Sequence, residues 1–285
     1  MTALSETAAR VPALPRLDWR LALPAGWLVL VFTAALTVDW LPVPTPTDMD
    51  FMAVETLPSA DHWLGTDQDG RDIFSRVAHG ARVSLVVGFL APLVGLFFGT
   101  LLGLLSAWYG GIARTSILVA LDAILAFPGL VLAMAVTAIL GASVGSVSLA
   151  LGVLTIPSFA RISRARALSL IQREFVLAAK TAGAGDTWIL LREVLPNMVM
   201  TLVTYTLTIV SVMIVIEGAL SFLGVGVPPP APSWGGMISE GRSALERAPY
   251  ISLIPAAAMF FTVLSLNVLG DRLRRRAEAR EGGLS

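Results

Sequence analysis

Few side chains in this sequence combine reactive chemistry with an unusual position. Asp122 and Glu217 are acids inside long apolar runs. An ionised side chain near the centre of a membrane span costs about 2.5–3.5 kcal/mol, so such a residue faces protein or water. For Asp122 we favour a hydrogen bond or ion pair to a neighbouring helix, with Arg114 as a candidate, over a role in a gate. For Glu217, structural pairing and lining of a translocation path both stay open.

The other reactive groups argue against a metal centre or an enzyme. The chain has no cysteine, which excludes thiolate ligands and thiol nucleophiles. His62 and His79 have no acidic or sulfur ligand at metal-binding spacing. Residues 67–70, Asp-Gln-Asp-Gly, look like the start of a calcium loop, but the glutamate at position 12 of an EF-hand is replaced by Ala78. The apolar runs contain no paired aspartates and no histidine, so we expect neither catalysis nor a bound cofactor or metal.

The chain also lacks a nucleotide-binding motif. A phosphate-binding loop needs a glycine-rich turn followed by Gly-Lys-Ser/Thr. The single lysine, Lys180, follows Ala179 instead. Any ATP-driven activity would therefore need partner proteins that bind ATP and magnesium.

Long apolar runs indicate the elements that position these groups. Hydrophobic residues make up 55% of the 285 residues and charged residues 14%, and the mean hydropathy is +0.77. About 20 apolar residues span the hydrocarbon core as a helix, and the runs lack the alternation of a barrel strand. The formal net charge of zero argues against a nucleic-acid partner. We therefore expect an all-α, polytopic membrane protein with six transmembrane helices, at about 21–41, 83–107, 115–140, 144–160, 197–222 and 251–270.

The basic residues predict the orientation of these spans. With the N-terminus in the cytoplasm, 15 of the 20 Lys and Arg residues lie inside, as the positive-inside rule requires. Both termini would then be cytoplasmic, and the basic end of the chain would lie near anionic membrane lipid. The expected divisions are a cytoplasmic tail (1–20), a first span (21–41), an extracytoplasmic loop (42–82), a core of five spans (83–271) with an inner loop (161–197), and a basic cytoplasmic tail (272–285).

The inner loop has features of a docking surface. Apolar residues recur at helical spacing through its first half, Gly183 and Gly185 then break the helix, and Asp186 or Thr187 could cap a new one. A cluster of small residues between 178 and 185 would let another protein's backbone come close. The alternative is an amphipathic linker that lies on the bilayer.

This loop resembles the EAA loop of the permease subunits of ABC importers. The match consists of Ala178-Ala179, Gly183 and Leu195-Pro196 at the family spacing. Leu177 replaces the glutamate of the motif, although Glu174 lies one helical turn earlier, and Glu193 replaces a hydrophobic residue. In that family the loop forms a coupling helix that sits in a groove of the ATPase. The resemblance implies a coupling role for Glu174, Leu177, Ala178, Ala179, Gly183, Ala184, Gly185, Asp186, Leu195 and Pro196.

Other segments resemble the dipeptide, oligopeptide and nickel permeases. Residues 62–85, Ala126-Phe127-Pro128 in the third run, and two segments at 220–224 and 230–235 match them in the right order, and the last is typical of the "C"-type subunit. The first of these segments would lie where a binding protein docks or help to close the extracellular side. Thr66, Asp67 or Asp69 would cap its helix, and Asp72 would favour the N-terminal end of that helix. Its motif residues are Gly65, Thr66, Asp67, Gly70, Arg71 and Asp72.

The resemblance implies a type I ABC importer permease fold and import of di- or oligopeptides across the bacterial cytoplasmic membrane. Its expected partners are a homologous second permease, two ATP-binding subunits or domains, an extracytoplasmic solute-binding protein and the peptide. Nickel, glutathione or another small solute is the alternative cargo. Alternatives of other classes are an ion-coupled secondary transporter and a purely structural membrane subunit. The first should carry several intramembrane acids or inverted repeats, and we find two acids and no convincing repeat.

Overall fold

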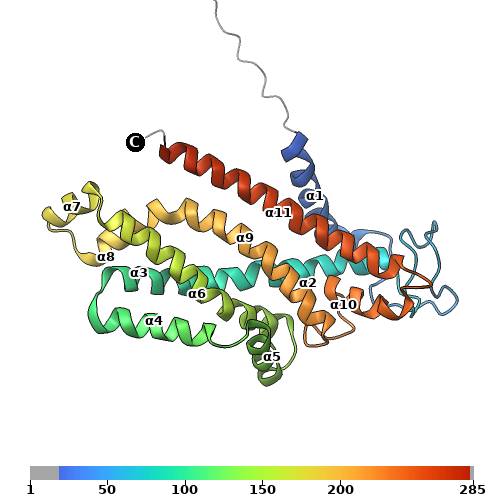
Figure 1. The fold of residues 1–285 in the computed structure, drawn as a ribbon. Coiled ribbons are helices and arrows are strands. Elements are labelled where there is room, and N and C mark those ends of the chain that lie inside the picture. The colour runs from blue at the N-terminus through green and yellow to red at the C-terminus, as the bar shows by residue number, and fades with distance from the viewer. Residues whose placement is uncertain (1–18, 283–285) are drawn as a thin grey trace, which may run out of the picture.

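The computed structural model describes residues 19–282, and most of them are helical (Figure 1). Within these residues, five helical stretches are long and apolar enough to cross a membrane, and a bent helix pair supplies a sixth candidate. The predicted count of six is confirmed in this form. The five stretches are α1 with η1 (Trp19–Thr37, Val38–Trp40), α2–η2–α3 (Ile73–Val94, Gly95–Gly99, Thr100–Trp108), α6 (Val144–Ile171), α8–η3–α9 (Asp186–Trp188, Ile189–Val194, Leu195–Phe222) and α11 (Tyr250–Gly282).

The sixth candidate is broken in the middle. The apolar run expected as one span over 115–140 forms α4 (Gly111–Leu125) and α5 (Gly129–Leu140), which meet at an angle of 88°. The break falls at Phe127-Pro128. Proline has no backbone N–H to donate within a helix, and it disfavours the helical conformation of the residue before it. The kink that a proline allows is here a complete break.

Several helices are longer than the apolar runs suggested. Helix α2 begins at Ile73 rather than near 83, because the Asp72 carboxylate accepts a hydrogen bond of 2.7 Å from the Ser75 backbone N–H and caps it. The predicted caps Thr66, Asp67 and Asp69 are therefore wrong. Helix α6 continues past 160 to Ile171, and α11 continues past 270 to Gly282. Residues 1–18 of the predicted N-terminal tail and 283–285 of the C-terminal tail lie outside the described part of the chain.

Glycines bring the central helices into close contact. Gly95, Gly99 and Gly103 lie four residues apart on α2–η2–α3 and face α6. A Cβ atom at Gly99 would lie 2.6 Å from the Ile156 carbonyl oxygen, and one at Gly103 would lie 2.6 Å from the Ala160 carbonyl oxygen. The glycine spacing therefore serves helix packing, as small residues do in membrane helices.

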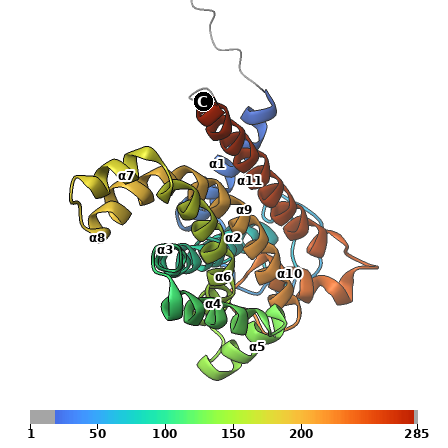
Figure 2. The same cartoon turned by 60° about the vertical axis from the view of Figure 1, so that its left-hand side comes forward.

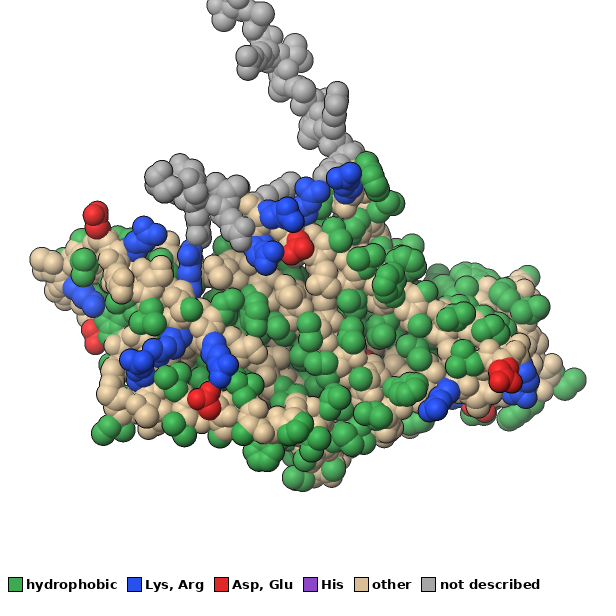
Figure 3. Space-filling model, viewed as in Figure 1, with side chains coloured by type: hydrophobic (Ala, Val, Ile, Leu, Met, Phe, Trp, Pro, Cys, Tyr) green, Lys and Arg blue, Asp and Glu red, His purple; other side chains and the backbone are tan. Residues whose placement is uncertain are grey.

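The helices form a long bundle with different structures at its two ends (Figure 1). The short helices α7 (Glu174–Thr181) and α8 lie at one end, which we call the α7 end. Residues 42–72 and helix α10 (Trp234–Glu240) lie at the other, the α10 end. In the view of Figure 3, charged side chains gather near the ends and upper edge, and the middle is mostly hydrophobic or neutral.

Candidate functional site

The predicted coupling residues come together at the α7 end of the bundle. Helix α7 starts at Glu174 after a break at Arg173, and Val176 anchors it through a buried cluster with Leu170, Ile189 and Val194. Gly183 ends this segment with a φ of +84°, a left-handed conformation that glycine adopts without steric cost. Figure 2 shows that α7 and α8 project from one side of the bundle.

This segment presents small and apolar side chains to its surroundings. Leu177 is 51% exposed and Trp188 is also exposed. The small side chains of Ala178 and Ala182 are exposed as well. Lys180 turns back, with its Nζ atom 4.4 Å from the ring centroid of Trp108 at the end of α3. The α7 end therefore offers an apolar surface on a short helix that α3 and η3 support.

The predicted cap of the next helix is wrong. Gly185 is the N-cap of α8, and no side chain caps it. Asp186 is instead the first residue of α8, where its negative charge interacts favourably with the positive end of the helix dipole. Helix α8 continues directly through η3 into α9, so Leu195 and Pro196 lie on the same helical stretch as Asp186.

Glu217 lies in a closed polar cluster inside the bundle. Its carboxyl oxygens accept hydrogen bonds from the Ser221 hydroxyl (2.8 Å) and the Ser84 hydroxyl of α2 (3.0 Å), and its side chain is fully buried. Ser84 accepts a bond of 3.3 Å from the Trp234 backbone N–H, and Ser233 donates one of 3.2 Å to Ser221. These bonds hold the start of α10 against α2 and α9, which fits the pairing interpretation of Glu217.

Asp122 pairs with a different arginine from the one suggested by the sequence. Its carboxylate lies 2.8 Å from the Arg161 guanidinium of α6, and Arg114 is not its partner. Both side chains of the pair are exposed within this chain. Asp122 and Glu217 therefore do not meet, because one lies on the surface of α4 and the other inside the α2–α9–α10 contact.

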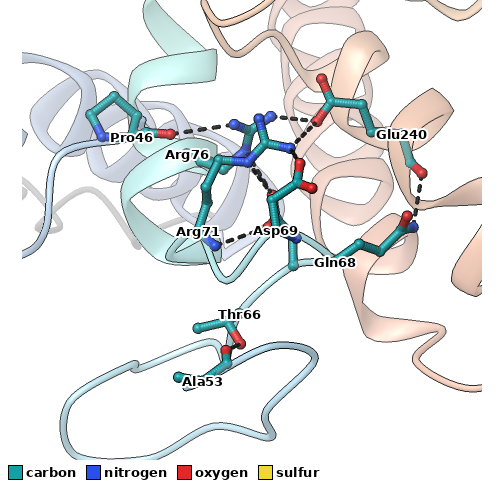
Figure 4. A network of polar contacts seen from close by, with 9 residues as sticks. Pro46, Ala53, Thr66, Gln68, Asp69, Arg71, Arg76 and Glu240 are labelled. Atoms are coloured by element: carbon teal, nitrogen blue, oxygen red, sulfur yellow. Dashed lines mark hydrogen bonds and ion pairs between the residues drawn. The ribbon is translucent and has the colours of Figure 1, made fainter. Parts of the chain in front are cut away.

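The outer motif forms an ion-pair network at the α10 end (Figure 4). The Arg71 guanidinium contacts Asp67 at 2.9 Å and also Asp69. The Arg76 guanidinium, 1% exposed, lies 2.5 Å from the Glu240 carboxylate at the end of α10. The network therefore ties the start of α2 to α10, across 164 residues of sequence.

Two glycines of the motif permit this tight geometry. Gly65 and Gly70 have φ values of +80° and +74°, and a Cβ atom at either would collide with backbone, that of Thr56 and Asp50 respectively. Thr66 is fully buried and bonds the Thr56 backbone N–H at 2.9 Å. All six predicted motif residues thus build one turn that precedes α2.

The histidines have acidic partners that the sequence did not reveal. His62 Nδ1 lies 3.0 Å from Asp72, and His79 Nε2 lies 3.1 Å from Asp39 in η1. Sequence separations of 10 and 40 residues hid these contacts. Among the residues with described placement, no group of three or more His, Asp or Glu side chains could hold a metal ion.

Sequence reasoning missed the partners that complete these sites. Glu240 is the central acid of the ion-pair network, but no motif surrounds it. Ser84 and Ser233 complete the Glu217 cluster from two other segments. Only Ser221 had a local signal, because a residue four positions after Glu217 lies on the same helix face.

Comparisons with known proteins agree with this architecture. The family of binding-protein-dependent transport system inner membrane components matches residues 99–282. The glutathione transport system permease protein GsiD of Pectobacterium atrosepticum is 42% identical over 89% of this chain and 85% of its own length. GsiD of Escherichia coli O6:K15:H31 is 41% identical over 88% and 83%. These relatives exclude the ion-coupled secondary transporter.

A solved structure shares the fold. A chain of the MetNI methionine ABC transporter in an inward-facing conformation superposes with a TM-score of 0.58, at 18% identity, over 71% of this chain and 96% of its own. The protein is therefore a non-catalytic, multi-pass inner-membrane protein with the type I ABC importer permease fold, and it works with ABC ATPase subunits in a transporter complex. The chain belongs to the family of binding-protein-dependent transport system inner membrane components, the permease subunits of ABC importers.

Proposed function

We propose that this permease carries glutathione across the inner membrane. The observation that carries the proposal is the 42% identity to a glutathione permease along 89% of the chain. The sequence motifs alone favoured di- and oligopeptides, with glutathione as an alternative. Glutathione is itself a tripeptide, so the two cargoes share terminal charges and amide groups.

The proposal includes an orientation and a set of partners. The α7 end faces the cytoplasm, where two ATPase subunits or domains bind ATP and magnesium and dock on α7. The α10 end faces outward, where a solute-binding protein delivers the cargo, and a homologous second permease completes the pathway. The uneven distribution of basic residues and the apolar α7 surface support this arrangement.

Coupling follows from the way α7 is attached. Val176 packs against residues of α6 and η3, and η3 continues into α9. A displacement of the docked α7 would therefore move α6 and α9 together, because packed side chains transmit movement rather than absorb it. The start of α10 is bonded to α9 and α2 through the Glu217 cluster, so the movement would reach the outer end.

Uptake by the reconstituted transporter tests the cargo. The complete complex in proteoliposomes, with ATP on the ATPase side and the binding protein on the other, should accumulate labelled glutathione. Unlabelled glutathione should compete, whereas dipeptides, a pentapeptide and Ni²⁺ in tenfold excess should compete less. Accumulation of a labelled dipeptide or of Ni²⁺ without accumulation of glutathione would contradict the proposal.

A further inference from the structure

An ion pair lies on the outside of this chain, between two of its membrane helices. Arg161 of α6 donates from Nη2 to the Asp122 carboxylate of α4 at 2.8 Å. The two side chains are 60% and 65% exposed within the chain. Ion pairs in membrane spans normally face protein or water, because contact between a charge and hydrocarbon is costly. What covers this pair therefore depends on how deep it lies.

The helices place the pair inside the span rather than among the headgroups. Trp108 ends α3, at the kind of position where aromatic residues mark the membrane interface. A Cβ atom at Gly103, five residues earlier, would lie 2.6 Å from the carbonyl oxygen of the residue before Arg161. Asp122 follows the start of α4 at Gly111 by 11 residues, which is about 16 Å along the helix. Because the hydrocarbon core is about 30 Å thick, lipid is a poor neighbour for this carboxylate.

The pair belongs to an edge of the bundle that other components must cover. Leu121 is the buried residue of α4, and Ala133 and Thr137 are those of α5. Figures 1 and 2 both show these two helices at one edge of the bundle. The proposed second permease and the cargo path that it completes are the available neighbours. A dry contact with the second permease would desolvate both charges at high cost, whereas an aqueous path leaves them hydrated.

The chemistry of the proposed cargo favours the path. Glutathione carries two carboxylates and one ammonium group near neutral pH, so it crosses the membrane as an anion. A guanidinium has five N–H donors in a planar fork that matches a carboxylate, and the exposure of Arg161 leaves donors accessible to a ligand. Arg164, one turn later on α6, is half-buried and donates to the Ser106 carbonyl oxygen at 2.9 Å instead.

We propose that Arg161 binds a carboxylate of the anionic peptide cargo during its passage, and that Asp122 holds the guanidinium in place between transport cycles. The inference rests on the proposed function, which supplies the cargo and the other wall of the path. A cargo carboxylate replaces Asp122 at the guanidinium, and the cargo ammonium group pairs with the released Asp122. An exposed ion pair contributes little free energy, so this exchange is nearly balanced and the cargo is not trapped.

Thiol chemistry tests whether the pair faces water. The chain has no cysteine, so Asp122→Cys introduces its only thiol beside an intact Arg161. In the complete complex in nanodiscs, an anionic methanethiosulfonate should modify this thiol at least tenfold faster than that of Phe260→Cys. Phe260 is the matched control, because it is an exposed apolar residue of the membrane helix α11. Equal rates would overturn the proposal, because they would place the pair in lipid or in a dry contact.

Protection of the same thiol tests the recognition of a carboxylate. S-methylglutathione in the millimolar range should slow modification of Asp122→Cys at least fivefold, whereas its dimethyl ester should slow it less than twofold. Addition of Arg161→Gln to this variant should abolish the protection. Equal slowing by the acid and the ester, or protection that survives Arg161→Gln, would overturn the proposal.

Exchange of the two charges separates recognition from a purely structural ion pair. Arg161→Gln should lower glutathione uptake by the reconstituted transporter at least tenfold. The double variant Asp122→Arg with Arg161→Asp keeps an ion pair, so it should assemble and unfold like the unaltered transporter but should not regain uptake. Normal uptake by Arg161→Gln, or recovery of uptake by the double variant, would overturn the proposal.

The thiol measurements also separate this site from the proposed function, because they need no transport. Failure of the unaltered transporter to take up glutathione would contradict the proposed function. Rapid modification of Asp122→Cys without protection by S-methylglutathione, in a transporter that does take up glutathione, would contradict the Arg161 site alone.

Discussion

At the scale of single residues, buried polar groups in this protein find partners on distant segments. Glu217 accepts hydrogen bonds from hydroxyl groups of α2 and α9, and Arg76 forms an ion pair with a carboxylate of α10. Burying such groups without partners is costly, so each partner contributes to the position of α10. We therefore assign Glu217 a positioning role and expect it to act through α10.

Substitution of Glu217 tests that role. Glu217→Gln should keep assembly and most uptake, because the amide oxygen can accept from one serine while the amide NH2 donates to the other, whose hydroxyl turns away. Glu217→Ala should lower the stability of the complex by about 1–3 kcal/mol, because it leaves buried hydroxyl groups without their acceptor. Thermal unfolding of the purified complex and uptake by proteoliposomes measure the two effects. Loss of uptake in Glu217→Gln with normal assembly and unfolding temperature would instead indicate contact with the cargo.

At the scale of elements, the close contact of η2 and α3 with α6 depends on glycines, which have no side chain. Gly99 packs against the Ile156 carbonyl oxygen and the Phe159 Cβ atom, each 2.6 Å from where its own Cβ would lie. Backbone cannot rotate away from a new methyl group, so the helices would have to separate. Overpacking of this kind costs about 1–3 kcal/mol.

Gly99→Ala should therefore lower the unfolding temperature of the complex and the yield of assembled transporter. Gly110→Ala is a matched control, because a Cβ atom there meets nothing within 4 Å. Fluorescence-detected size-exclusion chromatography with a temperature ramp compares the two variants. Equal unfolding temperatures would show that α3 and α6 have more freedom than their packing suggests.

At the scale of the whole molecule, the two ends of the bundle have different structures. The α7 end carries an apolar surface on a helix attached to α6 and η3, and the α10 end carries the ion-pair network that joins α2 to α10. The long helices α2–η2–α3 and α9 join these ends. Continuous helical stretches therefore run from the proposed ATPase contact to the ion-pair network at the opposite end.

A charge on the α7 surface should separate the permease from its ATPases. Leu177→Arg places a long cation on α7 at a side chain that is 51% exposed, so the permease should fold but co-purify with less than one tenth of the ATPase. Ile112→Arg makes the same change at another exposed residue near the start of α4 and should retain ATPase. Co-purification with a tagged permease measures both. Normal ATPase retention by Leu177→Arg would contradict docking on this surface.

The sequence by itself determined which segments are helical and membrane-spanning, because length and hydropathy act locally. It also located the EAA-like loop and the residues of the outer motif. It could not locate Glu240, which no local pattern marks, and it did not show that Ser233, within the matching segment 230–235, bonds Ser221 of the Glu217 cluster. Pro128 marks a position where the third apolar run can bend, but the surrounding packing sets the size of the bend.

The tertiary structure alone decided how the charged and polar groups pair. It joined Asp122 to Arg161 rather than to Arg114, made Asp72 the cap of α2, and enclosed Glu217 among serines of three segments. Hydrogen bonds and ion pairs act over about 3 Å, so they depend on which helices lie side by side, and composition does not specify that. The hydrophobicity of the sequence indicates that this chain crosses a membrane, and the packing of the helices determines which side chains meet within the protein.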